Sequence, residues 1–314
     1  MLNPVDRHAR LGALHRRWNA GGAGLPDAAL HGLLADAAAW DGWPLVDAVG
    51  TCLADREELD TAETLHLIDA RRALGRGEAA LALARALRHT YPFAPDHAGL
   101  EAELRSWLGW RQRFPLPGSH DELTLEPLAH HHARGFAWQY HDPAIAQLCC
   151  LPKFIDGLEW HHWLAGMLGE RRRLLYAVLH RDWGLIGCVS LVLHRDAGFF
   201  YYWLGPDFQG RGFGPRAGAC LLAMAERTCG LRSCYAKAFD VNLRSRRGLD
   251  KMGFADLGMR GTGEDCNQVF YRRGPPQTRR RTADQLHWLL ESMDASVRAA
   301  APASSRDDAP EPAR

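Results

Sequence analysis

Apolar residues recur at helical spacing through the first third of the chain. From Leu30 to Trp40, leucines and alanines stand three and four residues apart, which is typical of an amphipathic helix. Asp60 precedes Glu63 by three residues, the spacing of a capping box. Further helices are expected at residues 77–88 and 95–107. Glycine and proline turns separate these segments, so the pattern predicts antiparallel helical hairpins between about residues 25 and 109.

The segment from Ala70 to Pro95 resembles a single tetratricopeptide unit, with alanines at helical spacing between a Leu-Gly-Arg-Gly turn and a proline break. Such arrays need about three repeats to be stable. A generic helical domain is therefore the alternative interpretation. A helical surface of either kind is suited to bind a peptide or partner, to dimerise, or to act as a lid.

The pattern changes after residues 114–119, a cluster of proline, glycine and serine that is typical of a linker. The strands expected beyond it are 122–128, 173–180, 184–194, 198–204, 231–239 and two closing strands between 254 and 271. The helices expected there are 130–140, 159–168, 214–229, 242–252 and 283–300. The chain is thus divided into a helical domain at residues 1–117, an α+β domain at 118–276, and a C-terminal helix with a disordered tail at 277–314.

Composition and charge narrow the function classes. The chain is 46% apolar and 24% charged, as in a soluble globular protein, and its formal net charge is +1. Neither nucleic acid nor a membrane is an expected partner, and Arg279–Arg281 is interpreted as a solvated helix start. No apolar run approaches the roughly 20 residues of a membrane span, and no signal peptide is recognised. The eight cysteines form no C-x-x-C pair, so we expect free thiols and a cytoplasmic protein.

The segment from Tyr202 to Gly214 carries the clearest chemical signal. The β-prone residues Tyr202-Trp203-Leu204 end at a Gly-Pro turn, and the loop Gln209-Gly210-Arg211-Gly212-Phe213-Gly214 leads into an apolar helix. A strand, a glycine loop and a helix N-terminus together cradle a phosphate or pyrophosphate. The Gln-x-x-Gly-x-Gly spacing is neither the dinucleotide fingerprint nor the P-loop.

Two motifs resemble the GNAT acyltransferases over residues 122–273, and specifically the subgroup that contains the ribosomal-protein N-terminal acetyltransferases. The first is Tyr-Trp-Leu-Gly-Pro-x-x-Gln-Gly-x-Gly at residues 202–212. The second is Asn242-Leu243-Arg244-Ser245, followed by Lys251-Met252-Gly253-Phe254. The resemblance implies a mixed, mostly antiparallel twisted sheet flanked by helices, here preceded by an all-α domain.

The resemblance also implies an acyl-CoA substrate, most simply acetyl-CoA. The residues expected to bind it are Tyr202, Trp203, Leu204, Gln209, Gly210, Arg211, Gly212, Phe213, Gly214, Asn242 and Ser245. A backbone N–H of Trp203 or Leu204 would stabilise the oxyanion, and Ser245 would act as general acid or sulfur-positioning hydroxyl. The alternatives are structural: Asn242 as a helix N-cap, Ser245 bonded within its own helix, and Arg211 as an exposed loop arginine.

The sequence departs from its relatives at two places. The helix tyrosine that many relatives use aligns with Leu249, and the acidic residue expected before Tyr-Trp is replaced by Phe199 and Phe200. The candidate general bases are Glu126, His130, His161, His162, His194, Asp240 and Tyr201. Solvent water is a further candidate. No metal-type spacing such as H-E-x-x-H is present, so no metal is expected.

The sequence therefore predicts an acyl-CoA-dependent N-acyltransferase in which an amine attacks the thioester directly. The helical domain favours a peptide or protein acceptor, and a homodimer is left open. One alternative is a non-catalytic acyl-CoA sensor or scaffold whose helical domain binds a partner. Another is a longer-chain acyltransferase for a ribosomally made peptide, with Phe199–Tyr202 lining the acyl pocket. A thioesterase is disfavoured because no Gly-x-Ser-x-Gly elbow is present.

Overall fold

The computed structural model describes residues 4–116, 122–149, 152–170, 172–262 and 266–293. They fall into two compact units, residues 1–109 with 160–171 and residues 110–159 with 172–314. The predicted tail, the last residues of the helix predicted at 283–300 and part of the predicted linker lie outside the described residues. The domain boundaries drawn from the sequence remain a prediction.

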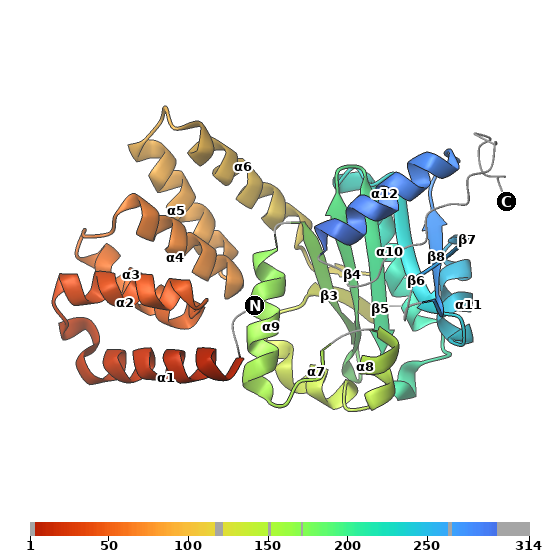
Figure 1. The fold of residues 1–314 in the computed structure, drawn as a ribbon, viewed down its shortest axis with the longest axis horizontal. Coiled ribbons are helices and arrows are strands. Elements are labelled where there is room, and N and C mark those ends of the chain that lie inside the picture. Colours follow the sequence, from red (N-terminus) through yellow and green to blue (C-terminus); the bar gives the residue numbers. More distant parts are fainter. Residues whose placement is uncertain (1–3, 117–121, 150–151, 171, 263–265, 294–314) are drawn as a thin grey trace. The chain divides into compact units, whose positions relative to one another are not determined.

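The first unit consists of helices joined by short turns (Figure 1). They are α1 (Pro4–Gly21), α2 (Asp27–Ala39), α3 (Trp43–Asp55), α4 (Thr61–Ala73), α5 (Gly77–Thr90), α6 (Pro95–Trp110) and most of α9 (Gly157–Gly169). The capping box is confirmed: Asp60 Oδ1 accepts from Glu63 N–H at 2.8 Å, and Asp60 N–H donates to Glu63 Oε2 at 3.2 Å. Helix α1 was not predicted, although Leu14 and Trp18, four residues apart, pack on the α2–α3 core.

Buried charges in this unit are paired. Glu101, at 5% exposure, accepts from Arg88 at 2.7 Å and also pairs with Arg85 and Arg105. The Arg88 hydrogen bond is the main cause that keeps the pKa of Glu101 below its usual value. These contacts hold helices together and need no ligand to explain them.

The second unit is built on one sheet with the strand order β1-β2-β3-β4-β5-β6-β8-β7. The strands are β1 (Phe114–Pro115), β2 (Leu123–Pro127), β3 (Arg173–His180), β4 (Gly184–His194), β5 (Ala197–Leu204), β6 (Ser233–Phe239), β7 (Ala255–Arg260) and β8 (Gln268–Arg273). Every neighbouring pair is antiparallel except β5 with β6, which is parallel. The α+β class and the mostly antiparallel sheet are confirmed.

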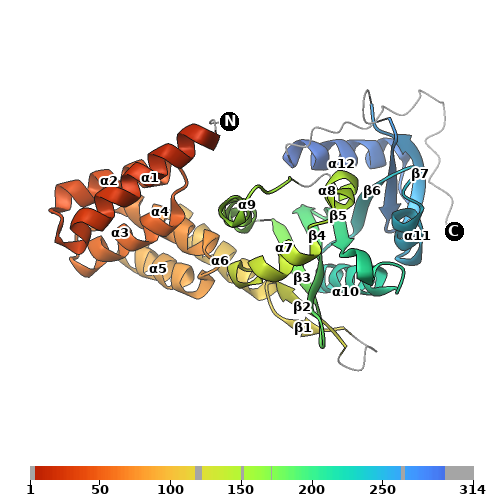
Figure 2. The same cartoon turned by 90° about the horizontal axis from the view of Figure 1, so that it is seen from below.

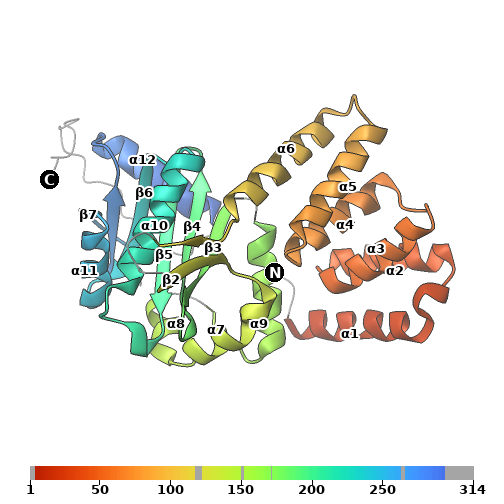
Figure 3. The same ribbon diagram turned by 180° about the vertical axis from the view of Figure 1, so that it is seen from behind.

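Helices cover both faces of this sheet. They are α7 (Ala133–Gln139), α8 (Pro143–Cys149), α10 (Phe213–Thr228), α11 (Leu243–Lys251) and α12 (Arg279–Ser292). Side chains alternate along a strand, so Phe200 joins the core under α10 and α11, whereas Phe199 joins the core under α12. Figure 2 shows α10 and α12 on opposite sides of the strands; α12 is in front in Figure 1, and α10 in Figure 3.

Two helices of this unit differ from the prediction. Helix α8 was missed, because its seven residues are too few to show a periodic pattern. Helix α12 begins at Arg279 rather than at residue 283, because Thr278 caps it: its Oγ1 accepts from Arg281 N–H at 3.3 Å. The basic run is thus the first turn of this helix. Among the described helices, none has both the length and the apolar character needed to cross a bilayer.

Candidate active site

Strands β5 and β6 pair with each other only near their beginnings. Among the described residues, 197–199 pair with 233–235, although β5 continues to Leu204 and β6 to Phe239. On its other side, β5 pairs with β4 along its whole length. Residues 200–204 therefore present a strand edge that β6 does not cover.

The register determines which backbone groups face this edge. Gly205 N–H donates to the Ile186 carbonyl of β4 at 2.9 Å. Successive residues of a strand direct their backbone groups to opposite sides. Trp203 therefore faces β4, whereas Tyr202 and Leu204 face the β6 side. Of the two predicted oxyanion donors, the register favours Leu204 N–H over Trp203 N–H.

The Trp203 side chain packs in an aromatic cluster. Its ring lies edge-on to Phe136 at 5.0 Å and to Tyr140 at 5.3 Å, measured between ring centroids. The side chain is 6% exposed. The indole therefore anchors β5 to α7 and the segment that follows it.

The glycine-rich loop has the geometry of an anion cradle. Gly210 and Gly212 have φ of +79° and +81°, a conformation that residues with a Cβ rarely adopt. Gly212 is the N-cap of α10 and offers no side-chain hydrogen bond to the first turn. The first amide N–H groups of the 16-residue helix thus lack a side-chain cap, and the helix dipole is positive at this end.

Gln209 connects the loop to both neighbouring elements. Its Nε2 donates to the Leu204 carbonyl at 3.0 Å, and its Oε1 accepts from Arg244 Nη1 at 3.1 Å. The side chain therefore links the end of β5 to α11. Arg211 is exposed, with its guanidinium carbon 6.0 Å from the centroid of the Phe208 ring.

Helix α11 begins with a hydrogen-bonded cap. Asn242 Oδ1 accepts from Ser245 N–H at 3.1 Å, so the structural alternative for Asn242 is observed. The Ser245 hydroxyl lies beside the Tyr202 phenol and opposes the increase in the pKa of Tyr202 that burial causes. Leu249, aligned with the tyrosine of many relatives, is 2% exposed and packs in the core.

Glu126, a candidate base, is surrounded by donors. It lies 3.0 Å from His131 Nε2, 3.4 Å from His132 Nε2 and 3.4 Å from Arg113 Nε. Burial lowers the pKa of His132 to about 4, with the neighbouring His131 a smaller cause. His132 is therefore neutral at pH 7. His130 begins the short 3₁₀ turn that carries these histidines.

Glu126, His131 and His132 are also close enough together to be considered as metal ligands. The tautomer of His132 argues against this. Its Nδ1 accepts from Ala129 N–H at 3.0 Å, so in the neutral ring the proton is on Nε2. Nε2 then has no lone pair for a metal and instead donates to Glu126.

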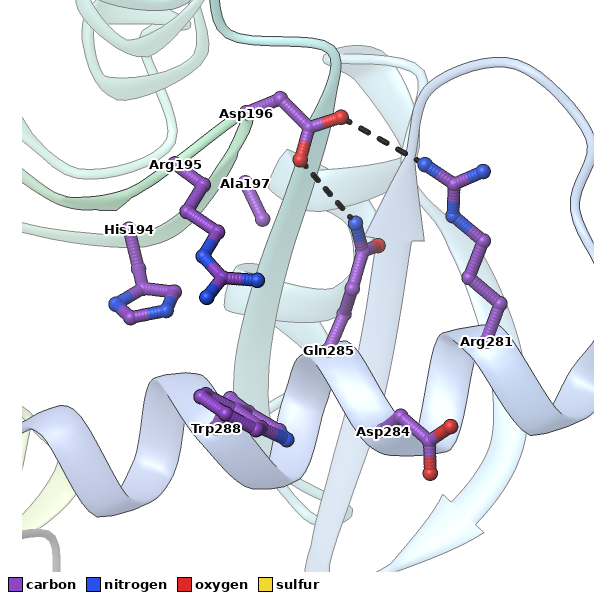
Figure 4. Close-up of a pocket in the computed structure, with 8 residues that line it drawn as sticks. All are labelled: His194, Arg195, Asp196, Ala197, Arg281, Asp284, Gln285 and Trp288. Atoms are coloured by element: carbon purple, nitrogen blue, oxygen red, sulfur yellow. Dashed lines mark hydrogen bonds and ion pairs between the residues drawn. The ribbon is translucent and has the colours of Figure 1, made fainter.

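His194 lines a pocket between the β4–β5 turn and α12 (Figure 4). Its Nδ1 is 3.4 Å from Arg172 Nη1, which can only donate, so this lone pair is already engaged. Burial, with Arg172 and Arg195, lowers the pKa of His194. The pocket adjoins Ala197, which is about 23 Å along β5 from Leu204 at the usual strand rise. His194 is therefore poorly placed to act as a base near the loop.

Two further candidate bases also make fold contacts, and two others lie in the helical unit. Tyr201 directs its hydroxyl to Met293 Sδ at 3.6 Å, and Asp240 Oδ2 pairs with Arg260 at 3.6 Å. His161 and His162 belong to the helical unit, where burial lowers the pKa of His162.

Sequence reasoning missed the role of the Tyr202 side chain. A Cβ at Gly214 would lie 2.6 Å from Tyr202 Cε2, and one at Gly248 would overlap the Tyr202 hydroxyl. The phenol thus lies against glycines of both α10 and α11. The glycine at residue 248 was the available signal, but which ring fills the space depends on the fold.

Residues 122–255 match the acetyltransferase (GNAT) domain family, so the chain contains a GNAT acetyltransferase domain. This is the class expected from the two sequence motifs. A comparison with curated proteins gives no match.

Among solved structures, similar chains include the microcin C7 self-immunity acetyltransferase MccE in complex with acetyl-CoA and AMP. It is 19% identical, with a TM-score of 0.45, over 51% of this chain and 98% of that one. RimL, a ribosomal L7/L12 α-N-protein acetyltransferase, is 19% identical with a TM-score of 0.46, over 52% and 96%. The spermidine N-acetyltransferase of Vibrio cholerae is 18% identical with a TM-score of 0.43, over 49% and 94%.

Proposed function

We propose that this protein is an N-acyltransferase that transfers the acyl group of an acyl-CoA, most simply acetyl-CoA, to an amine of a peptide or protein. The observation that carries the proposal is the uncovered edge of β5, which leads directly into the glycine-rich, uncapped start of α10. Acyl-CoA matches both features. Its thioester lies on a long arm that carries amide groups suited to the strand edge, and its pyrophosphate at the other end is suited to the start of α10.

The donor would be held mainly by backbone groups. The amide groups of the pantetheine arm would pair with the edge groups of Tyr202 and Leu204, as an added strand pairs with a sheet edge. The pyrophosphate would accept hydrogen bonds from amide N–H groups between Gly210 and Gly214. Gln209 keeps this arrangement rigid through its bonds to Leu204 and Arg244.

The reaction would be a direct displacement at the thioester. The amine nitrogen bonds to the carbonyl carbon, the C–S bond breaks with its electron pair on sulfur, and the ammonium proton passes to water. Leu204 N–H is the proposed donor to the developing oxyanion, and the Ser245 hydroxyl the donor to the departing thiolate. Water is the proposed proton acceptor because Glu126, His194, Asp240 and Tyr201 are engaged in fold contacts.

A peptide or protein acceptor is proposed because a unit of helical hairpins accompanies the acetyltransferase domain. Such a unit can bind an extended chain, whereas a small amine would not need it. The choice of acceptor and the length of the acyl group would then be separate properties. The choice of acceptor is tested with different peptides, and the acyl length with different acyl-CoA donors.

The test is the release of free thiol from acetyl-CoA with and without peptides that carry free amines. The proposal predicts release that depends on the amine, together with a mass increase of the peptide by one acyl group. Stabilisation by CoA without turnover on any amine would instead support the sensor. Mass spectrometry of the CoA species that copurify with the protein identifies the donor, and a long-chain species would support the longer-chain alternative.

A further inference from the structure

A pocket lies at the beginning of β5, away from the glycine-rich loop. It has a volume of about 330 Å³ and is formed by the β4–β5 turn and α12 (Figure 4). This volume is within the range of small-molecule sites. The pocket adjoins Ala197, the first residue of β5, whereas the uncovered strand edge ends at Leu204. It is therefore a separate feature from the proposed donor site.

The turn beside the pocket has an arginine in a strained backbone conformation. Arg195 and Asp196 connect His194 to Ala197, which pair across the hairpin. Arg195 has φ of +55°, a left-handed conformation that is unfavourable for a residue with a Cβ. The β3–β4 hairpin instead has a glycine with positive φ next to its turn, Gly184 at +67°. An arginine kept in this conformation beside a pocket indicates a role for its side chain.

The Arg195 guanidinium is positioned by an aromatic ring and not by a carboxylate. Its central carbon lies 5.3 Å from the centroid of the Trp288 ring, and Trp288 is 51% exposed. Contact with a ring face uses the plane of the guanidinium and leaves the N–H groups at its edge free to donate. The neighbouring Asp196 is bound instead by Arg281 at 3.7 Å and by Gln285 Nε2 at 3.4 Å. Among the described residues, no carboxylate forms an ion pair with Arg195.

His194 adds a second donor at the Arg195 end of the pocket. Because its Nδ1 accepts from Arg172, the proton of the neutral ring is on Nε2. Nε2 is buried and has no hydrogen-bond partner among the described residues. An unsatisfied buried donor is costly, so an acceptor that reaches it contributes to binding. Figure 4 shows His194 and Arg195 at one end of the pocket and Asp284 at the other.

The charges at the pocket match a ligand with a single negative charge. Two of the lining side chains are arginines and two are aspartates: Arg195, Arg281, Asp196 and Asp284. Arg172, bonded to His194, adds a further positive charge. One positive charge is therefore uncompensated, and the two carboxylates oppose a second negative charge on a ligand.

We propose that this pocket binds a small aromatic carboxylate. The carboxylate lies at the Arg195 end, where the free edge of the guanidinium offers two parallel N–H groups to its two oxygens. The aromatic ring of the ligand contacts the exposed part of the Trp288 indole and the wall at Ala197. The site is independent of acyl transfer, because the pocket shares no residue with the uncovered edge or the glycine-rich loop.

The test is a titration of the full chain with 4-fluorobenzoate, followed by fluorine NMR. We expect saturable binding at one site, with a dissociation constant on the order of 1 mM, the affinity that typical ligand efficiency allows for a molecule of this size. Arg195→Gln should weaken binding at least about tenfold, because it removes a charged donor pair. Trp288→Leu should weaken binding roughly fivefold, because it removes the stacking surface. Both side chains are exposed, so both variants should fold.

Arg181→Gln is the matched control. Arg181 is also an exposed arginine in a hairpin turn, followed by an aspartate, but it pairs with that aspartate, Asp182, at 3.4 Å. Its replacement should leave the affinity for 4-fluorobenzoate at the wild-type value. Acetate and inorganic phosphate serve as competitors. Acetate, which lacks a ring, should displace the probe only at roughly tenfold higher concentration, and phosphate should do no better at equal ionic strength.

Binding that does not saturate, or that is equally weakened by Arg181→Gln and Arg195→Gln, would overturn the inference. Stronger competition by phosphate than by acetate would overturn the ligand class, since the pocket would then select charge and not a carboxylate. Saturating CoA should leave the probe bound. Displacement of the probe by CoA would show that the pocket is not separate from the donor site, and would also overturn the inference.

Discussion

The two faces of β5 use the same kinds of side chain for different purposes. On the α12 face, Phe199 is fully buried in a closed apolar cluster, and Tyr201 directs its hydroxyl to a methionine sulfur. On the α10–α11 face, Tyr202 meets glycines and the hydroxyl of Ser245. The first face is built from contacts that stabilise the fold, whereas the second brings polar groups to the uncovered strand edge. The difference indicates where substitutions should affect folding and where they should affect catalysis.

The strongest test of the α12 face is Phe199→Ala. Removing a fully buried phenylalanine should lower the free energy of unfolding by about 3–5 kcal/mol, because a cavity replaces the ring. Urea denaturation measures this loss, and Phe199→Leu is the smaller control change. The CoA affinity of the folded fraction should be unchanged. Weak CoA binding with little destabilisation would show that this face belongs to the site.

Protonation of His132 should act on the fold and not on the acyl-transfer step. Its pKa of about 4 in the folded protein is below the value of about 6.5 expected when unfolded, so its stabilising effect is complete above pH 6.5 and is lost as the pH falls toward 4. The total loss is roughly 3 kcal/mol. Urea denaturation at several pH values should show this slope, and His132→Asn should reduce it. If the free energy of unfolding fell equally with pH in the variant, the low pKa would not belong to His132.

On the α10–α11 face, Ser245→Ala should lower kcat by roughly a hundredfold while the free energy of unfolding changes by less than about 0.5 kcal/mol. Steady-state kinetics with acetyl-CoA and an accepted peptide measures the first quantity, and urea denaturation the second. Ser245→Thr keeps a hydroxyl and should retain more activity than the alanine variant. Full activity in Ser245→Ala would show that the Ser245 hydroxyl has no role in acyl transfer.

The glycine loop can be tested with a pair of matched variants. Gly212 and Gly230 both have positive φ, +81° and +70°, and a Cβ at either would meet open space. Each change to alanine should cost about 1–2 kcal/mol of stability through backbone strain. Calorimetry should show weaker CoA binding in Gly212→Ala, and unchanged binding in Gly230→Ala. Equal affinities would argue against an anion site at the loop.

The smallest effect is expected for Tyr201→Phe. Its hydroxyl contacts Met293 on the α12 face, so its loss should change kcat by less than about twofold and stability by less than about 0.5 kcal/mol. A large fall in kcat with a changed pH profile would instead make Tyr201 the general base.

The sequence was sufficient for the parts of the fold that depend on local patterns. The continuous apolar strands β3 and β4, the capping box at Asp60 and the glycine loop all have short-range signals. Helices α1 and α8 were missed, because one is dominated by polar residues and the other is one to two turns long. The start of α12 was predicted at residue 283 instead of Arg279, because the cap at Thr278, directly before the run of arginines, was not recognised.

The site was less predictable because its key relations connect distant positions. That Leu204, and not Trp203, faces the uncovered edge follows from pairing with Ile186 in another strand. That the Tyr202 ring fits against both α10 and α11 depends on glycines at residues 214 and 248, in two helices. No local spacing encodes these contacts, since they arise from the packing of β5 against α10 and α11.

The most direct measurement for the central claim is amide hydrogen exchange, resolved by residue, with and without CoA. If the edge of β5 and the start of α10 bind the donor, CoA should slow exchange at Tyr202, Leu204 and the loop amides from Gly210 to Gly214. Trp203, already directed at β4, should change little. If CoA slowed exchange only at other amides and left these unchanged, CoA would not bind at the edge of β5 and the start of α10.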